Sequence, residues 1–369
     1  MHHPRIAHSR EGGLRLSLSA LFTALVLGRS QVTFAQGCVV SRGTSMTPGQ
    51  HDPFIGGEEA LPPTSGFQGF FNYRWFRSDT MFVNDVEQPH DGREIINNST
   101  FFDVGMTYAF TPRWSATMTI PFSTHDRSQV VPRTGKPPQR YSTSSTGLGD
   151  LRFEGNAWIF DPTQHLKGNI LLGLGVSAPT GDSDVQDTFE IASGANPRAE
   201  IHAVDPSIQL GSGGWGVIFD LNAYREIIPR LNIFLNGTYT MTPEEKYTPT
   251  ASFIFLGDYS IADSYLVRGG LEYLIWPKYS LSLSLAGRAE GVPVHDLVGG
   301  STGFRRPGCS VSIEPGISVS VKSWSLSLNA PVALYRNREQ NIAEKAAGVP
   351  PAAASFADFV IIGSISKRF

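Results

Sequence analysis

Charged side chains recur at every second position in several stretches of this sequence. Asp150, Arg152 and Glu154 are the clearest example, because single apolar residues separate them. Alternate side chains of a β-strand point to opposite faces, so these three would share one face. Such a mixed face can filter solutes by charge, or it can stabilise a narrow interior through ion pairs, and both roles stay open. The complete set that we predict on polar faces, as lining of a pore, is Arg74, Asp103, Asp150, Arg152, Glu154, Asp220, Arg268, Glu272, Arg288, Glu290 and Glu314.

Adjacent histidine and aspartate residues are the only other candidates for acid–base chemistry. They occur at 90–91, 125–126 and 295–296, all in stretches that we expect to be outer loops. An imidazole beside a carboxylate can activate water for hydrolysis. No Gly-x-Ser-x-Gly nucleophile motif accompanies them. We therefore assign no catalytic residue, expect the protein not to be an enzyme, and keep a hydrolase as a minor alternative.

The sequence offers little to hold a metal or a cofactor. Residues 179–190 collect four carboxylates, but their spacing differs from that of a calcium-binding helix–loop–helix, so a solvated acidic loop is the favoured interpretation. The two cysteines, Cys38 and Cys309, belong to no Cys-x-x-Cys motif. They are either unrelated thiols or one disulfide formed in an oxidising compartment. We expect neither a metal nor a cofactor.

The first residues resemble a signal for export. Arg5, Arg10 and Arg15 precede a short apolar run over 16–27, and Ala35 ends a plausible cleavage site. The run is too short to span a membrane as a helix. We predict a signal peptide over 1–35 and then a Gly- and Pro-rich segment over 36–65, which is either a periplasmic linker or a plug. A membrane barrel would occupy 66–369.

Most of the remaining chain alternates between apolar and polar residues. Phe102, Val104 and Met106 share one face, for example, while Asp103 and Thr107 share the other. Each alternating stretch is long enough to cross a bilayer as a tilted strand. In a soluble β-sandwich, the minor alternative, the apolar face would instead form the core. The expected strands are 66–77, 100–110, 113–124, 147–160, 168–179, 209–225, 230–242, 263–275, 279–290, 309–321, 324–335 and 357–369.

The connections between these strands alternate in length. Short turns, several with proline, fall near 111–112, 161–162, 229–230, 277–278 and 322–323, whereas the other connections are long. Bacterial outer-membrane barrels have short periplasmic turns and long extracellular loops. The fold class that we predict is therefore all-β: a transmembrane, antiparallel, up-and-down β-barrel of about twelve strands in a Gram-negative outer membrane. Its composition agrees, with 38 glycines and 11% aromatic residues.

Three segments resemble a family of bacterial outer-membrane proteins associated with the meta-pathway of phenol degradation. They are 147–151 (GLGDL), 173–182 (GLGVSAPTGD) and 213–216 (GGWG). Members of that family often carry a lysine shortly before the Pro-Thr-Gly, where this chain has Ser177 and Ala178. The resemblance implies transport of aromatic or hydrophobic compounds across the outer membrane.

We therefore expect a porin-like channel or transporter for passive uptake of small molecules. Its expected partners are outer-membrane lipid, a small-molecule solute and the barrel assembly machinery, which would bind the C-terminal Phe369. The net charge of -3 argues against a nucleic-acid partner. The alternative is a structural or adhesive barrel with a closed lumen and partner-binding loops.

Overall fold

The structure is a computed structural model that describes residues 65–191, 198–251 and 257–369. The predicted signal peptide, residues 36–64 and Cys38 lie outside the described residues. The elements of the wall are β1 (Gly66–Val83), β3 (Ile96–Ala109), β4 (Trp114–Arg133), β5 (Lys136–Leu148), β6 (Leu151–Trp158), β7 (Gly168–Ala178), β10 (Gly216–Ile228), β11 (Leu231–Met241), β14 (Ser264–Trp276), β15 (Leu281–Val292), β16 (Gly308–Val321), β17 (Trp324–Asn329), β18 (Val332–Arg338) and β19 (Ala354–Arg368). Smaller elements are β2 (Val86–Glu87), β8 (Gln186–Ile191), β9 (Arg198–Ala203), η1 (Pro206–Ile208), β12 (Lys246–Tyr247), β13 (Tyr259–Ser260), η2 (Pro277–Tyr279) and α2 (Ile342–Ala347).

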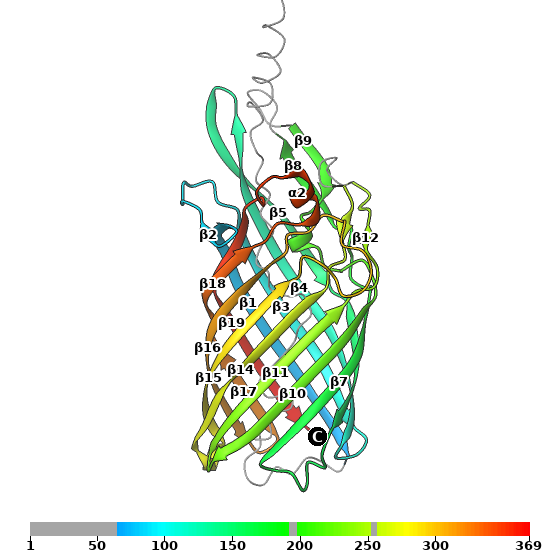
Figure 1. Ribbon diagram of the computed structural model, residues 1–369, viewed down its shortest axis with the longest axis vertical. Coiled ribbons are helices and arrows are strands. Elements are labelled where there is room, and N and C mark those ends of the chain that lie inside the picture. The colour runs from blue at the N-terminus through cyan, green and yellow to red at the C-terminus, as the bar shows by residue number, and fades with distance from the viewer. Residues whose placement is uncertain (1–64, 192–197, 252–256) are drawn as a thin grey trace, which may run out of the picture. The chain divides into compact units, whose positions relative to one another are not determined.

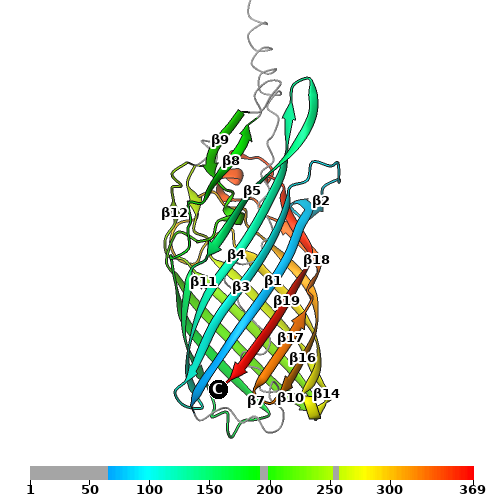
Figure 2. The same ribbon diagram turned by 180° about the vertical axis from the view of Figure 1, so that it is seen from behind.

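The wall strands form one closed antiparallel barrel. Each strand pairs with its neighbour in the chain, and β19 closes the ring by pairing with β1, where Phe71 lies opposite Ile365 (Figures 1 and 2). β5 and β6 both pair with β4, and β17 and β18 both pair with β16, so each of these pairs is a single wall strand with a break. The barrel therefore has twelve wall strands, and the predicted fold class is confirmed.

The two faces of the wall differ in polarity as the alternation predicts. Apolar side chains point outward, so Leu174 is 60% exposed. Polar side chains point inward, and the inward Arg268 is only 3% exposed. The sandwich alternative is wrong, because a soluble fold would bury this apolar face. Two charged residues of the outer face, Arg225 and Lys367, both lie near the ends of their strands. A charge there meets the interface, where it costs far less than at mid-bilayer.

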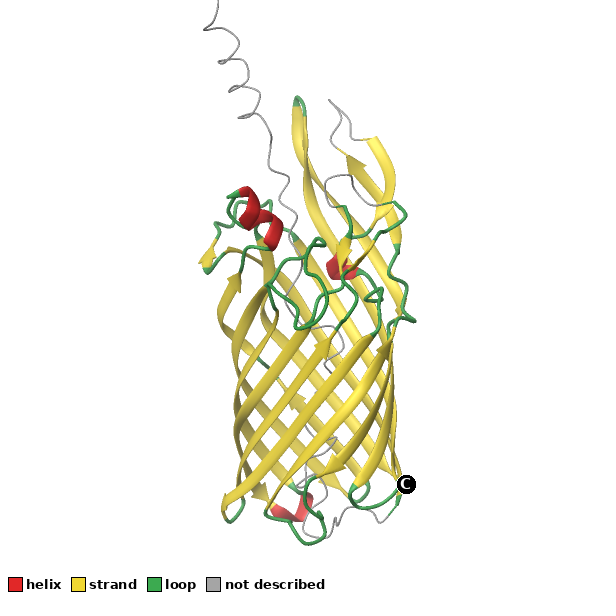
Figure 3. Ribbon diagram, turned by 45° about the vertical axis from the view of Figure 1, so that its right-hand side comes forward, coloured by secondary structure: helices red, strands yellow, loops and turns green. Residues whose placement is uncertain are grey.

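Both ends of the described wall meet at the end that carries the short turns. The amide of Phe369 donates to the carbonyl of Phe67 at 2.9 Å. The predicted short turns all join wall strands at this end, and the long connections lie at the other end (Figure 3). Within the described residues, no helix has the length and apolar character needed to cross a membrane.

Two features of the wall differ from the predicted strands. β4 and β5 extend beyond the barrel as a hairpin, because polar residues that look like a loop in sequence pair along both strands and turn at Gly135, whose φ is +70°. The wall is also broken between β5 and β6, next to Pro121 of β4. A proline has no N–H to donate, so it interrupts the ladder at that point.

Candidate functional site

A cluster of buried charges lies on the inward face of β14, β15 and β16. Glu314 is at its centre and is 1% exposed. Its carboxylate lies 3.3 Å from the guanidinium of Arg268 and 3.2 Å from that of Arg288. Arg288 also binds Glu290 at 3.0 Å, and Glu272 accepts a hydrogen bond from Ser318 at 3.1 Å. Arg268, Arg288, Glu290 and Glu314 thus form one connected charged cluster, and Glu272 is buried on the same face.

A second charged group lies on β3, β6 and β10. Arg152 donates to the carboxylate of Asp103 at 3.1 Å. Asp220 accepts a hydrogen bond from Thr238, and it faces Glu154. The sequence pattern could not tell which of these side chains would meet, because it says nothing about contacts between strands.

Arg74 of β1 connects the two groups across the lumen. Its charge interacts with Glu290 on one side and with Asp103 on the other. Four steps round the wall, through β19, β17/β18 and β16, separate β1 from β15, so the interaction with Glu290 crosses the interior. Ten of the eleven predicted lining residues therefore form two inward groups that Arg74 joins.

Asp150, the eleventh, does not lie within a strand as predicted, although it also lines the interior. It sits in the break between β5 and β6, and its carboxylate accepts hydrogen bonds from the amides of Gly181 at 3.0 Å and Ser212 at 2.7 Å. A half-buried carboxylate bound by main-chain N–H groups fixes the segments that supply them. Its main role in this structure is to anchor the wall and the loops together.

The break beside Asp150 also explains glycines in two of the three segments of the family resemblance, and Gly211 just before the third. A Cβ on Gly211 would lie 2.2 Å from the carbonyl oxygen of Gly181, and a Cβ on Gly181 would lie 2.9 Å from the carbonyl carbon of Gly149. Only glycine allows main chains to approach this closely. The segments 147–151 and 173–182 therefore meet Gly211 at one point of the wall.

A chamber of about 200 Å³ opens inside the barrel beside this junction. One side is formed by inward residues of β1, β3 and β4, including Phe101 and His125. Arg74 and Arg152 lie on its lumen side, and the segment 206–212 with Arg306 lies on the loop side. The chamber therefore lies between the mid-barrel charges and the extracellular loops.

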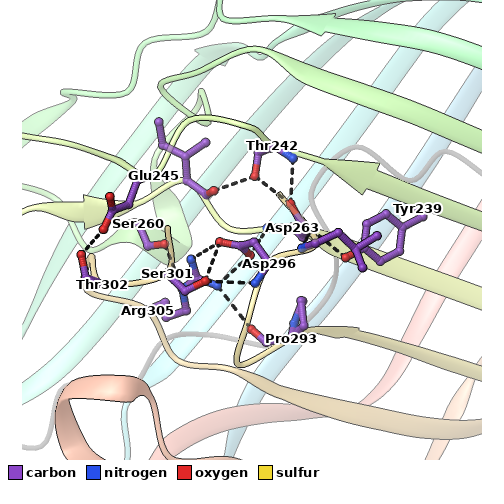
Figure 4. Close-up of polar contacts among 12 residues, drawn as sticks. Tyr239, Thr242, Glu245, Ser260, Asp263, Pro293, Asp296, Ser301, Thr302 and Arg305 are labelled. Atoms are coloured by element: carbon purple, nitrogen blue, oxygen red, sulfur yellow. Dashed lines mark hydrogen bonds and ion pairs between the residues drawn. The ribbon is translucent and has the colours of Figure 1, made fainter. Parts of the chain in front are cut away.

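The extracellular loops above the chamber are tied together by buried polar contacts (Figure 4). Asp263 accepts hydrogen bonds from the hydroxyl of Tyr239 and the amide of Thr242, each at 2.7 Å. Arg305 is 2% exposed and holds the carboxylate of Asp296 through two hydrogen bonds, one of them 2.7 Å long. The amide of Asp263 donates to the carboxylate of Asp296 at 2.9 Å, and the amide of Leu297 donates to the carboxylate of Asp263 at 2.9 Å, so the loop that follows β11 is joined to the loop that follows β15.

A buried ion triad attaches the segment 204–212 to these extracellular loops. We call the loops and this segment together the cap. The carboxylate of Asp205 lies 3.3 Å from the guanidinium of Arg127 and 3.2 Å from that of Arg306. Burial opposes ionisation of Asp205, but the attraction of the two arginines outweighs it and holds the pKa of this carboxyl below its ordinary value. Nothing in the sequence marked this triad, because neither Asp205 nor Arg306 lies in an alternating stretch.

The candidate catalytic pairs do not form. His125 and Asp126 lie in β4 and not in a loop, so their side chains point to opposite faces. His90 lies near Glu87 and Glu94, at 3.7 and 3.6 Å. Asp296 binds Arg305, as described above.

The acidic loop and Cys309 can also be placed. Within the described residues, no group of three or more histidine, cysteine or acidic side chains could hold a metal ion. Asp182, Asp184 and Asp187 each accept a hydrogen bond from a main-chain amide, so they order the loop.

Cys309 alternates with the inward Ser310 and so lies on the outward face of β16. A plug inside the lumen would therefore not meet its thiol.

The closed ring, the apolar outer belt and the polar interior define a bacterial outer-membrane β-barrel. An outer membrane channel from Pseudomonas putida F1 has a similar fold: its TM-score is 0.54 at 13% identity, with 88% of this chain and 99% of that chain covered. At this identity the likeness concerns the fold alone. Two barrels are less similar. One is the translocator domain of the autotransporter NalP from Neisseria meningitidis, with a TM-score of 0.44 at 12% identity and with 82% of this chain and 88% of that chain covered. The other is the P. putida toluene transporter TodX, with a TM-score of 0.43 at 10% identity and with 82% and 90% covered. No family model matches the sequence, and no curated protein matches it, so the family resemblance stays a prediction.

Proposed function

We propose that the protein is an outer-membrane channel that lets small molecules enter passively. The observation that carries this proposal is the chamber of about 200 Å³, which lies within the barrel and is lined by inward polar and aromatic side chains. A barrel that only anchors loops needs no such space, and small barrels fill their interior with side chains. The charged layer around Arg74 and Glu290 would then act as the selective part of the path.

The channel would interact with three partners. Outer-membrane lipid would surround the apolar belt, and a small solute would occupy the chamber. The barrel assembly machinery would recognise Phe369, which ends the chain beside β1 with 75% of its surface exposed. Phe369→Ala should then slow assembly in cells and leave the refolded barrel unchanged.

A closed-lumen barrel with partner-binding loops is the second candidate function. The buried triad of Asp205 and the ion pair between Arg305 and Asp296 favour it, because both hold the extracellular loops in place. Loops fixed in this way can present a constant surface to a partner.

Conductance in a planar bilayer separates the two functions. The full chain, refolded in detergent, should give steady ohmic steps if solutes pass. Arg268→Gln should shift ion selectivity toward cations, because it removes a positive charge from the lumen, and the number of insertions should stay the same. A folded protein that gives no steps would contradict the channel and support the closed barrel.

A further inference from the structure

We propose that the chamber binds a small aromatic carboxylate. This inference rests on the proposed channel function, because it names the class of solute that would occupy the path. Phenolic or hydrocarbon solutes would carry no charge, so the difference between the two classes is measurable. The argument uses the charges, the hydrogen-bond donors and the rings of the chamber lining.

The charges of the lining favour an anion. Three arginines and two aspartates line the chamber. Both aspartates are already engaged, since Asp103 accepts from Arg152 at 3.1 Å and Asp150 accepts from the two main-chain amides of the wall junction. A cation entering the chamber would have to compete with these bonds. An anion would instead meet three guanidinium groups: that of Arg74, which lies over Phe101, and those of Arg152 and Arg306, each of which already shares one carboxylate, Asp103 and Asp205 respectively.

Buried donors in the lining also need an acceptor. Nε of Arg152 and Oγ of Ser207 are buried and have no hydrogen-bond partner within the described residues. Arg152 is 4% exposed and lies on the lumen side of the chamber, whereas Ser207 lies on the loop side. A buried donor without an acceptor is costly. A carboxylate supplies acceptors of the strongest kind for a guanidinium.

The rings of the lining favour a flat apolar body behind that carboxylate. Phe76 and Phe101 stack with an interplanar angle of 28°, and the guanidinium of Arg74 lies 4.2 Å above the ring of Phe101. His125 meets the same ring edge-on with centroids 5.0 Å apart. Aromatic faces pack well against another ring. A cavity of about 200 Å³ also suits a single-ring compound.

Glu290 is the main opposing charge. It interacts with Arg74 across the lumen, but it does not line the chamber and is already bound to Arg288 at 3.0 Å. The carboxylate of the solute would therefore approach Arg152 and Ser207, and its ring would lie toward Phe101.

Equilibrium dialysis of the refolded full chain with radiolabelled benzoate tests this site. We expect saturable binding, with benzyl alcohol and acetate each competing about tenfold less well, because the first lacks the charge and the second lacks the ring. Arg152→Gln should weaken benzoate binding about tenfold, which is the size of one charge-assisted hydrogen bond. Arg338→Gln is the matched control, since this arginine is also buried and paired with a carboxylate but lies outside the lining.

Ser207→Ala is the second variant, because it changes a loop and not the wall. It should weaken benzoate binding about threefold, as expected for one neutral hydrogen bond. Heat-modifiable mobility on gels confirms that each variant is folded. Unchanged binding in folded Arg152→Gln, or equal competition by benzyl alcohol or acetate, overturns the inference. Ohmic pores without benzoate binding overturn it alone, whereas benzoate binding by a silent barrel overturns only the channel function.

Discussion

Glu314 offers a direct measure of how much the mid-barrel charges stabilise the protein. Its carboxylate lies 3.3 Å from Arg268 and 3.2 Å from Arg288. At an effective dielectric constant of about 20, each contact represents roughly 5 kcal/mol of gross attraction. Desolvation cancels much of this energy, but removing one partner leaves the other charges buried and costs about 3–5 kcal/mol. Glu314→Gln should therefore lower the free energy of unfolding by that amount.

The double variant decides whether the loss comes from the ion pair. Arg268→Gln combined with Glu314→Gln removes one positive and one negative charge, so it should be more stable than the sum of the single losses by about 2–3 kcal/mol. The assay is urea unfolding of the barrel in lipid vesicles, followed by tryptophan fluorescence. Strictly additive losses would refute the reasoning, because they would show that the two side chains do not interact.

Three further predictions test the wall, the junction and the cap. Gly211→Ala should sharply reduce the yield of folded barrel, because the added Cβ would lie 2.2 Å from a carbonyl oxygen. Gly287→Ala should be tolerated, because nothing lies within 4 Å of the added carbon. Equal yields of the two variants would contradict the close approach at Gly211. Val267→Arg should destabilise the barrel in vesicles by up to about 2–4 kcal/mol, since it places a charge on the lipid face, and urea unfolding checks this against Val267→Leu, which keeps an apolar side chain at the same position. The pKa of the Asp205 carboxyl is depressed in the fold. The stability that this ionised carboxylate contributes is therefore complete above its ordinary pKa near 3.8 and is lost as the pH falls through the lower folded pKa. Protease resistance of the cap should persist at pH 5, and loss of that resistance at pH 5 would contradict the triad.

The resolved strands show how much of the fold could be predicted from local pattern. Alternation of the kind seen at Phe102, Val104 and Met106 gave the strand, its outward face and its approximate ends. The outer hairpin of β4 and β5 was not predicted, because its serines, threonines and glutamines carry no apolar period. Asp150 was predicted on a strand for a similar reason: alternation cannot reveal a break that depends on Pro121 in the neighbouring strand.

The sequence by itself determined the barrel, its orientation and the face of each wall residue, because these follow from the period of a strand and from the lengths of the turns. The tertiary structure alone decided which inward side chains meet. The charge of Arg74 acts on Glu290 from four strands away round the wall, and Arg306 reaches Asp205 over 101 residues of chain. Such contacts depend on how the wall curves and where the loops fold back, and strand pairing fixes only the neighbours within the wall. The chamber lies among these contacts, which is why its chemistry appears only in the folded protein.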